Sequence, residues 1–401
     1  MHGDRGYLTR RTALKTGTAG ILGAIGLSAT QVSAQESDQN FGAGRTLTTS
    51  RGPNYGGGED YVEEHDAGFT SDDANFVVES ADELETALEA AEYGDVVFVP
   101  RDAEIDTGLR TNTSRGPPGY HVPEGVTLAS DRGVDGSPGG LIYTDSSSDD
   151  WPQENWPMAV HSDARVTGLR IRGKYWDAEE IVGTRYGVGL HIWDGDWNAE
   201  PGTTTNVEID NCEFSGWSSS CVSQYTGATD CRVHHCDFHD TLIDGLGYGV
   251  SVNAGHCEID HNTFNRNRHA VACSGSSGTS YEAHRNVVGD YTIGHVFDVH
   301  QPGGDRFDIH HNTVRASHYP SGNPAPNVTI RDVPDDLAWI HNNWFYNPKE
   351  PRETPDMWTD EAIRQVFVDE WTNVEWERNH YGSETEPDPG VGAPHSEKVR
   401  W

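Results

Sequence analysis

Lysine is scarce in this 401-residue chain, and basic residues as a whole are few. Lysine and arginine together number 28 against 64 aspartates and glutamates, and only four of the 28 are lysines. The formal net charge of −36 destabilises a compact fold by self-repulsion unless salt screens it, and the Debye length is only about 3 Å at 1 M salt. We therefore expect a halophilic protein. Without a basic stripe, nucleic acid is not an expected partner.

Long apolar runs are also rare, and the one near the N-terminus has a recognisable context. Arg10 and Arg11 precede a Gly- and Ala-rich apolar run over 16–29, which is followed by Val-Ser-Ala at 32–34. This order predicts a twin-arginine export signal over residues 1–34 with a small-residue cleavage site. The run is too short and too rich in glycine for a membrane span. We therefore expect a secreted, extracellular protein, soluble or loosely attached to the cell surface.

The second half of the chain repeats one short phrase, in which apolar and polar residues alternate before an Asn or Cys and a final apolar residue. Six copies and a weaker seventh lie at 207–214, 231–238, 257–264, 281–288, 307–314, 338–345 and 374–381. Successive Asn or Cys positions are 24, 26, 24, 26, 31 and 36 residues apart. Such spacing is typical of a solenoid, whose repeats must stack to bury their apolar faces.

The alternation has period two, so each phrase predicts a short strand with one face inward. A second alternating segment occurs in each repeat, for example at 222–225 and 250–253, and no repeat holds a helical stretch of ten residues. Two or three strands per turn predict an all-β fold, the parallel β-helix.

A column of asparagines supports the β-helix. We expect these side chains to sit at a repeated bend in the αL conformation and to hydrogen-bond from one rung to the next. The column comprises Asn262, Asn286, Asn312, Asn343 and Asn379, with Cys212 and Cys236 at the same position in earlier repeats.

A helix is expected before the repeats, over residues 80–94. Ser80 can cap its start and Gly94 can end it. Its apolar face is formed by Leu84, Ala87, Leu88 and Ala91. Such an amphipathic helix can cover the open first rung of a β-helix.

The chain resembles the pectin-lyase-like β-helix superfamily in four successive features. They are this helix, the following Gly-Asp-Val-Val-Phe-Val-Pro at 94–100, the segment Val-Pro-Glu-Gly-Val-Thr-Leu-Ala-Ser-Asp at 122–131, and the Asn-bearing repeats. The resemblance covers residues 76–382 and implies a right-handed parallel β-helix with an N-terminal capping helix. It implies no single activity, since that superfamily includes polysaccharide lyases, glycoside hydrolases, epimerases and non-catalytic surface proteins. Outside this domain we expect a flexible Gly-rich segment over 35–75 and a disordered acidic, Pro-containing tail over 383–401.

All six cysteines lie between residues 212 and 273. Cys212 and Cys236 are one repeat apart in one column, as are Cys231 and Cys257, and stacked strands bring such pairs within disulfide range. Side chains that project side by side suit the disulfide dihedral poorly, so disulfides and buried free thiols both stay open.

The outward residues of the second strands are the candidates for contact with a long ligand. Aligning these strands gives a first outward column of His161, His191, Ser223, Ser251, Ala272, Asp298 and Thr329. A second column, two positions later, holds Asp163, Trp193, Tyr225, Asn253, Ser274, His300 and Arg331. The two columns combine possible bases, acids, a cation and aromatic platforms for sugar rings, although an ordinary solvated polar face is the competing interpretation.

These residue types suit β-elimination from a uronate polymer, which needs a cation for the C6 carboxylate, a base for the C5 proton and an acid for the leaving oxygen. Arg331 is the candidate cation, and His300 or His191 the candidate base. Tyr225 or a histidine is the candidate acid, and Asp298 can share a proton with His300.

Further residues are candidates for substrate binding. Trp193 and Tyr225 can stack on sugars, and Asn253 lies in the same column. Beside the columns, Arg266, Arg268 and His269 can anchor an anionic sugar or serve as counter-ions to nearby carboxylates.

Hydrolysis instead needs two carboxylic acids about 5–9.5 Å apart. Within the two columns only Asp298 and Asp163 are carboxylic acids, and they lie several rungs apart, which disfavours a hydrolase. Loop carboxylates such as Asp194, Asp240 and Asp244 keep a hydrolase open.

A different column, just before the asparagines, alternates acids and histidines. It holds Asp210, His234, Asp260, His284, His310 and His341. Neutral imidazoles and carboxylates one rung apart can bind a divalent cation, for which His234, Asp260 and His284 are the candidates and Ca²⁺ one possible ion. A stacked, hydrogen-bonded polar ladder is the alternative.

The leading hypothesis is a secreted, monomeric polysaccharide-active enzyme, a lyase that cleaves an acidic, uronate-containing polysaccharide by β-elimination. The alternatives are a glycoside hydrolase on the same fold and a non-catalytic cell-surface β-helix protein that binds glycans.

Overall fold

In a computed structural model of the chain, the described residues are 55–108, 119–146, 158–183, 187–193, 195–196, 198–356 and 360–399. They all belong to one compact unit. The predicted export signal over 1–34 lies outside them, as does the first part of the predicted flexible segment, 35–54. Within this described part, the helices fall short of the length and apolar character that crossing a membrane requires.

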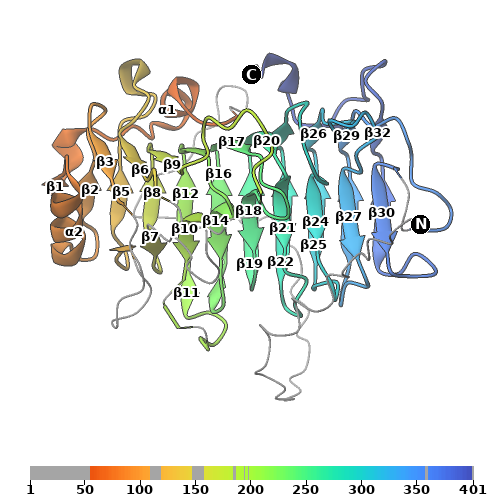
Figure 1. The fold of residues 1–401 in the computed structure, drawn as a ribbon, viewed down its shortest axis with the longest axis horizontal. Helices are drawn as coiled ribbons and strands as arrows, with labels where there is room; N and C mark the ends of the chain where they lie inside the picture. Colours follow the sequence, from red (N-terminus) through yellow and green to blue (C-terminus); the bar gives the residue numbers. More distant parts are fainter. Residues whose placement is uncertain are drawn as a thin grey trace, which may run out of the picture. The chain divides into compact units, whose positions relative to one another are not determined.

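Three long parallel sheets form the body of the described structure (Figure 1). Sheet 1 contains β1 (Phe76–Val77), β2 (Val96–Phe98), β5 (Thr127–Ala129), β8 (Arg165–Thr167), β12 (Glu208–Asp210), β16 (Cys231–His234), β19 (His256–Asp260), β22 (Ser280–His284), β25 (Phe307–His310), β28 (Ala338–His341) and β31 (Val374–Glu377).

Sheet 2 contains β4 (Tyr120–Val122), β7 (Met158–Val160), β10 (Val188–Ile192), β14 (Ser220–Gln224), β18 (Tyr248–Val252), β21 (His269–Cys273), β24 (Phe297–Val299), β27 (Val328–Arg331) and β30 (Ile363–Val366). Sheet 3 contains β3 (Glu104–Asp106), β6 (Leu141–Tyr143), β9 (Arg170–Arg172), β13 (Glu213–Ser215), β17 (Asp237–Thr241), β20 (Thr263–Asn267), β23 (Val287–Val288), β26 (Thr313–Val314), β29 (Trp344–Phe345) and β32 (His380–Tyr381). A short pair, β11 (Thr204–Thr205) and β15 (Ala228–Thr229), lies apart from them.

The chain visits the sheets in the fixed order 1, 3, 2, so β12, β13 and β14 make one rung and β16, β17 and β18 make the next. This is a right-handed parallel β-helix, and the prediction of fold class is confirmed. The first half of each sequence phrase forms a strand of sheet 1 and its last residues a strand of sheet 3. The second alternating segments form sheet 2.

Apolar side chains fill the bore because every rung points the same residue class inward. The rings of Phe214, Phe238 and Phe264, from three successive rungs, stack with centroids 5.0 and 4.9 Å apart. All three are fully buried. Burial of this kind supplies most of the favourable free energy of such a fold.

The asparagine column forms the hydrogen-bonded ladder that was predicted. Asn286 donates its backbone N–H and its Nδ2 to Oδ1 of Asn312, at 2.9 and 3.0 Å, and Nδ2 also donates to the carbonyl of Ile259. The predicted αL conformation is wrong for these residues. It belongs to the residue one position earlier, with φ between 50° and 55° at Asn211, His235, His261, Arg285, His311, Asn342 and Arg378. The ladder residue must point its amide inward, so the preceding residue makes the turn.

The capping helix is present as α2 (Ala81–Ala90). Ser80 accepts a hydrogen bond from the backbone N–H of Glu83, and Leu84, Ala87 and Leu88 are buried. The helix ends at Ala90, earlier than the predicted Gly94, because Ala91 already has extended φ and ψ. Gly94 instead turns the chain, with φ of 94°, toward β2.

Part of the segment predicted to be flexible packs on sheet 1. It includes α1 (Glu59–His65), whose Tyr61 is buried, and the short helix η2 (Ser71–Asp73). A further short helix, η3 (Val134–Gly136), follows β5. Near the other end, η4 (Ser396–Lys398) lies in the predicted disordered tail, where the carbonyl of Ser396 accepts a hydrogen bond from Arg315 at 2.6 Å. Specific side-chain contacts thus hold both segments, although neither has the composition of a packed core.

All six cysteines are free thiols and are buried. Cys231 and Cys257 are direct cross-strand partners in sheet 1, as their column position predicted. Of the two alternatives, disulfides and buried free thiols, the structure therefore contains the free thiols, which pack as small apolar residues.

Removing one ladder amide tests how much the column stabilises the fold. The substitution Asn312→Ala deletes the acceptor of the Asn286 N–H and the donor to the Ala283 carbonyl. Two buried backbone groups then lack partners, at about 1–3 kcal/mol each. Chemical denaturation in high salt should therefore show that Asn312→Ala lowers the free energy of unfolding by about 2–6 kcal/mol. The exposed-loop control Asn323→Ala should change this free energy by less than about 0.5 kcal/mol. Equal effects of the two substitutions would refute the structural role of the ladder.

Candidate active site

Strand pairing in sheet 2 fixes which outward residues share a column. His191 pairs with Ser223, which pairs with Ser251, and the register continues through Ala272, Asp298 and Thr329 to Arg364 on β30. The predicted alignment from His191 to Thr329 is therefore correct. Its start is wrong, because the partner of His191 on β7 is Ala159 and not His161. The prediction also stopped one rung early, before Arg364.

Asp298 lies at the centre of a group of basic side chains. Its Oδ2 accepts a hydrogen bond from Nη2 of Arg331 at 2.7 Å and lies 3.0 Å from Nε2 of His300 and 3.4 Å from Nε2 of His269. The Asp298 side chain is completely buried, whereas those of His300 and Arg331 are 34% and 26% exposed. A ligand at the surface therefore meets the imidazole and the guanidinium, with the carboxylate behind them.

Asp298 is held as a carboxylate. Burial raises the pKa of its carboxyl group, but interactions with His269, His300 and His295 outweigh burial and hold the pKa well below its usual range. Because the Nε2–H of His300 points to an ionised acceptor, the other ring nitrogen, Nδ1, carries a lone pair when this histidine is neutral. The pair has the geometry of a base and the carboxylate that orients it.

Three residues that the columns did not predict complete this group, together with His295. Arg364 donates to Oγ1 of Thr329 at 3.0 Å and lies 3.2 Å from a ring nitrogen of His295. Tyr319, from the insertion between β26 and β27, places its hydroxyl 3.3 Å from Nδ1 of His295. Tyr248 stacks on His269 with ring centroids 5.3 Å apart. Extending the column by one rung would have identified Arg364, but an insertion outside the repeat gives no signal for Tyr319.

The protonation states of these residues follow from their burial. Burial raises the pKa of both Tyr319 and Tyr248, so both hydroxyls keep their protons. Burial lowers the pKa of His295 to about 3 and that of His269 well below its usual range. Nδ1 of His269 hydrogen-bonds to the carbonyl of His295.

Three polar atoms in this group are buried and have no hydrogen-bond partner within the described part of the chain. They are Oδ1 of Asp298, Nη1 of Arg268 and Nε2 of His269. The Arg268 guanidinium lies 5.9 Å from the ring centroid of Tyr248, which places it beside His269. Buried polar atoms without a hydrogen-bond partner are rare in native proteins. Where they do occur, a ligand or an ordered water often supplies the missing hydrogen bond.

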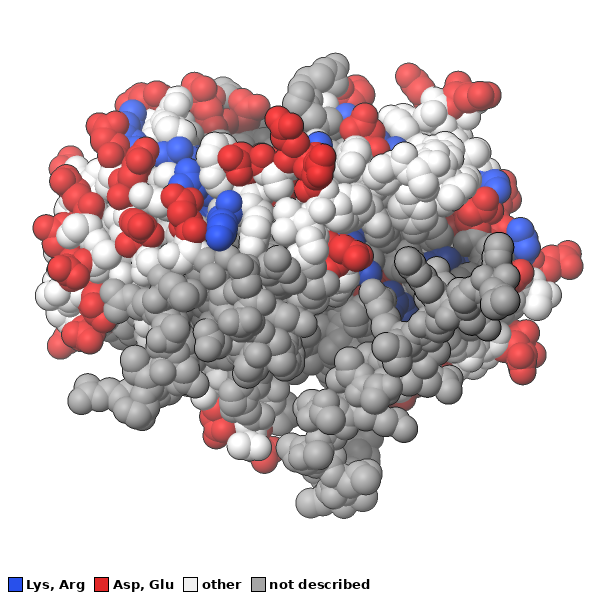
Figure 2. All heavy atoms as spheres, in the orientation of Figure 1, with Lys and Arg blue, Asp and Glu red and all other residues white. Residues whose placement is uncertain are grey.

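Figure 2 shows a recess on the drawn face with basic side chains inside it, in the part of the view where Figure 1 draws β24. Acidic side chains are spread over the left, upper and right parts of the same view, and one lies at the edge of the recess. The group at Asp298 contains three arginines, Arg268, Arg331 and Arg364, in a chain with 64 acidic and only 28 basic residues. The site therefore concentrates positive charge that the surrounding surface lacks.

His191, Trp193 and Tyr225 form a separate aromatic group on the same face. The rings of His191 and Tyr225 stack with centroids 4.9 Å apart, and those of Trp193 and Tyr225 are 6.1 Å apart. His191 and Trp193 are buried, and burial lowers the pKa of His191 to about 3. Asp298 lies four strands from His191, which is roughly 19 Å at the normal strand spacing. These residues therefore cannot act on the same bond as His300.

The remaining predicted binding residues have other partners. Arg266 pairs with Asp240 at 2.5 Å and donates to the carbonyl of Ala178, so it acts as a counter-ion in sheet 3. Asn253 donates to Oγ of Ser251 at 3.3 Å and lies between the aromatic group and the Asp298 group. Of the predicted set, His269, Asp298, His300 and Arg331 come together, with Arg268 beside them.

The acid and histidine column on sheet 1 forms diagonal pairs between neighbouring strands. Arg232 holds Asp260 through two hydrogen bonds of 2.8 Å, and His284 lies 3.0 Å from Glu258. His234 lies 3.0 Å from Glu208. Glu208, Asp210 and His234 form one group that can hold a metal ion, and Glu258, Asp260 and His284 form another. The aspartates already pair with arginine and the glutamates already contact histidine, which favours the polar ladder over the Ca²⁺ interpretation at these positions.

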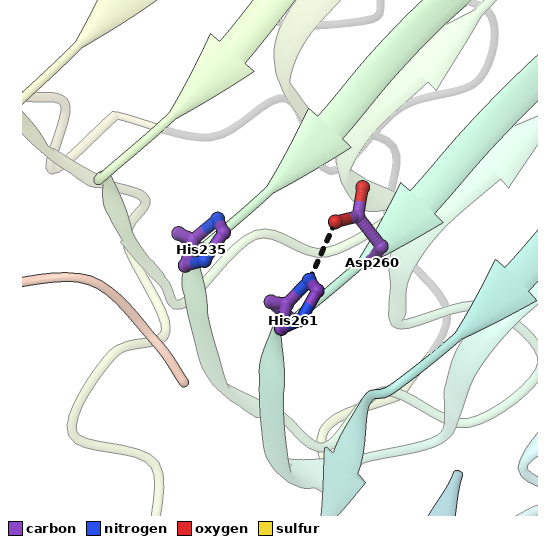
Figure 3. Close-up of side chains that lie close together, drawn as sticks. All are labelled: His235, Asp260 and His261. Carbon is purple, nitrogen blue, oxygen red and sulfur yellow. Dashed lines mark hydrogen bonds and ion pairs between the residues drawn. The ribbon is translucent and has the colours of Figure 1, made fainter. Parts of the chain in front are cut away.

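A third such group, His235, Asp260 and His261, lies at the turn between sheets 1 and 3 (Figure 3). Its two imidazoles stack face to face, with centroids 4.7 Å apart and an interplanar angle of 3°. Nδ1 of His261 donates to Oδ2 of Asp260 at 2.6 Å.

No protein-family model matches the chain, and no curated protein matches it. Among solved structures, it is similar to an alginate lyase from Paenibacillus sp. str. FPU-7, at 11% identity and a TM-score of 0.37. The similar region covers 77% of this chain and 99% of that chain. A likeness this weak supports no conclusion about activity. The β-helix implied by the superfamily resemblance is confirmed by the sheet order, but membership of the superfamily is not shown.

Proposed function

We propose that this protein is a secreted polysaccharide lyase that cleaves an acidic, uronate-containing polysaccharide by β-elimination at the Asp298 group. The observation that carries the proposal is the contact of Asp298 with His300 and Arg331 inside a cluster of three arginines. An otherwise strongly acidic protein must place such a cluster at the point where it binds a polyanion.

The residues of this group match the three requirements of the reaction. Arg331 neutralises the C6 carboxylate, which acidifies the C5 proton, and Arg364 adds positive charge beside it. Nδ1 of neutral His300 removes the C5 proton, while Asp298 stabilises the imidazolium that results. The C4–O bond then breaks, a C4–C5 double bond forms, and the leaving oxygen takes a proton from a buried hydroxyl. Tyr319, which burial keeps protonated, has that role.

Hydrolysis is the less suitable reaction for this group. A glycosidase requires a carboxylic acid that is protonated at the working pH, together with a second carboxylate about 5–9.5 Å away. Asp298 is held ionised by its histidines and by Arg331, so it cannot supply the proton. Its described contacts within hydrogen-bonding distance are histidine and arginine rather than a second acid.

Secretion is part of the proposal and rests on the twin-arginine pattern at Arg10 and Arg11. Replacing both arginines by lysine should keep the protein inside a twin-arginine-competent host, whereas the unmodified chain should accumulate in the medium. Equal amounts of both chains in the medium would contradict this mode of export.

The lyase activity is tested by incubating the protein with alginate, pectate and glycosaminoglycans in molar salt and recording the ultraviolet absorbance of unsaturated products. The substitution His300→Asn should lower the rate about 10²–10⁴-fold, because it removes the base. The substitution Arg331→Ala should lower it about 10²–10³-fold. The matched control is Arg306→Ala, which removes an exposed arginine paired with Asp336 and should leave the rate unchanged.

Other outcomes assign other functions. New reducing ends without ultraviolet absorbance would indicate a hydrolase. Binding of a polymer without any cleavage would indicate a glycan-binding surface protein. An absorbing product that His300→Asn forms at the unmodified rate would refute the role of this group, provided that the thermal unfolding of the variant is unchanged.

A further inference from the structure

The segment Tyr55–Ala67, here called the strap, lies over the turn between sheets 1 and 3. The N–H of Gly56 donates to the carbonyl of His261 at 3.0 Å, and the N–H of Gly58 donates to Oδ1 of Asn211 at 2.7 Å. Tyr61 of α1 donates its hydroxyl to Asp210 at 2.8 Å. One residue per rung has the αL conformation at this turn, and these residues, from Asn211 to Arg378, are here called the αL column. The contacts above fix the strap next to one part of it.

The αL column changes its residue type under the strap. In most rungs it holds asparagine or arginine, or a histidine without a histidine in the neighbouring rung. His235 and His261 are the two members that are histidines in successive rungs, and their rings stack at 4.7 Å (Figure 3). Asparagine at Asn211 and Asn342 shows that the turn itself does not require an imidazole.

Asp260 lies beside this pair and completes a set of three possible ligands. One ligand atom from each of His235, His261 and Asp260 lies within 4.8 Å of the other two. In Figure 3 the three side chains come from adjacent rungs and gather at one end of the strands. His235 is buried, and burial lowers the pKa values of both histidines, so both imidazoles are neutral at pH 7 and able to act as ligands.

His65, the last residue of α1, adds an independent observation. Its ring centroid lies 5.2 Å from that of His235 and 4.9 Å from that of Tyr61. Both of its ring nitrogens are buried, and neither has a hydrogen-bond partner among the described residues. Burial lowers the pKa of His65 to about 4, so it is a neutral imidazole. Leaving such a group unbonded costs free energy, and a bound ion or an ordered water can satisfy it.

We propose that His65, His235, His261 and Asp260 bind a divalent transition metal of the zinc type, which fastens the strap to the β-helix. Three imidazoles and one carboxylate match the ligand preference and four-coordination of Zn²⁺, whereas Ca²⁺ and Mg²⁺ prefer oxygen ligands. The two other groups on sheet 1 have one histidine each and suit zinc less well.

Binding has a cost at Asp260 that the site must overcome. Arg232 already donates to both oxygens of this carboxylate, and His261 donates to one of them. A carboxylate offers about four lone-pair positions, so it can keep Arg232 as a neighbour while one oxygen turns to the metal. His261 stays a neutral imidazole when a metal binds, with its ring proton on the nitrogen that does not face the metal.

The test measures zinc rather than activity. The full chain, stripped with a chelator in molar salt, is titrated with Zn²⁺ and separately with Ca²⁺ and Mg²⁺, and bound metal is measured after gel filtration. One zinc per chain and a higher unfolding temperature with Zn²⁺ alone are expected, since a ligand that binds only the native state stabilises it. His65→Gln and His235→Asn should each lower the affinity for zinc at least tenfold.

The matched control is His311→Asn, at the same column position but outside the cluster, which should keep zinc binding. Asparagine occupies this turn at Asn211 and Asn342, so neither His235→Asn nor His311→Asn should disturb the fold. Absence of stoichiometric zinc, or unchanged affinity in His65→Gln and His235→Asn, would overturn the proposal. Arg331→Ala should bind zinc normally, so this result is independent of the outcome of the lyase assay.

Discussion

The stacking of rungs at the normal strand spacing of about 4.7–4.9 Å is the constraint on which this structure depends. It places equivalent residues of successive repeats in direct contact, so each position must tolerate a copy of itself. Phenylalanines and asparagines do so, by ring stacking and by amide ladders. Charged residues need partners of the opposite sign or hydrogen-bond donors, and sheet 1 pairs Arg165 with Asp210 and Arg232 with Asp260 across neighbouring strands. The stacked Glu258 and Glu282 are each contacted by a histidine.

The candidate active site lies where sheet 2 stops following this rule. The column that begins with His191 passes through small residues and then reaches Asp298, with Thr329 and Arg364 on the next two strands. A buried carboxylate needs a compensating charge and hydrogen-bond donors, and from the adjacent column Arg331 provides the charge and His300 a ring nitrogen 3.0 Å away. The same two residues are partly exposed, so the arrangement that stabilises Asp298 also presents a base and a cation to a ligand.

The sequence repeat made much of the fold and of the candidate active site predictable. Period two, the asparagine column and the spacing defined the β-helix, and the alignment of the second strands placed Asp298, His300 and Arg331 together. Tyr319 was not predictable, because it lies in an insertion with no equivalent in other rungs. The strap was missed for a related reason: its Gly-rich composition suggests flexibility, while its order depends on individual contacts such as that of Tyr61 with Asp210. The helix α2 ends before the predicted Gly94 because the backbone is already extended at Ala91.

The central claim is that the cations around Asp298 recognise the carboxylates of a uronate polymer. Calorimetric titration of the His300→Asn variant in molar salt, with a uronate oligosaccharide and with the same oligosaccharide after reduction of its carboxyl groups, tests it directly. The account predicts that the acidic oligosaccharide binds at least tenfold more tightly than the reduced one, and that Arg331→Ala in the same background removes this difference. Equal affinity for the two oligosaccharides would contradict it.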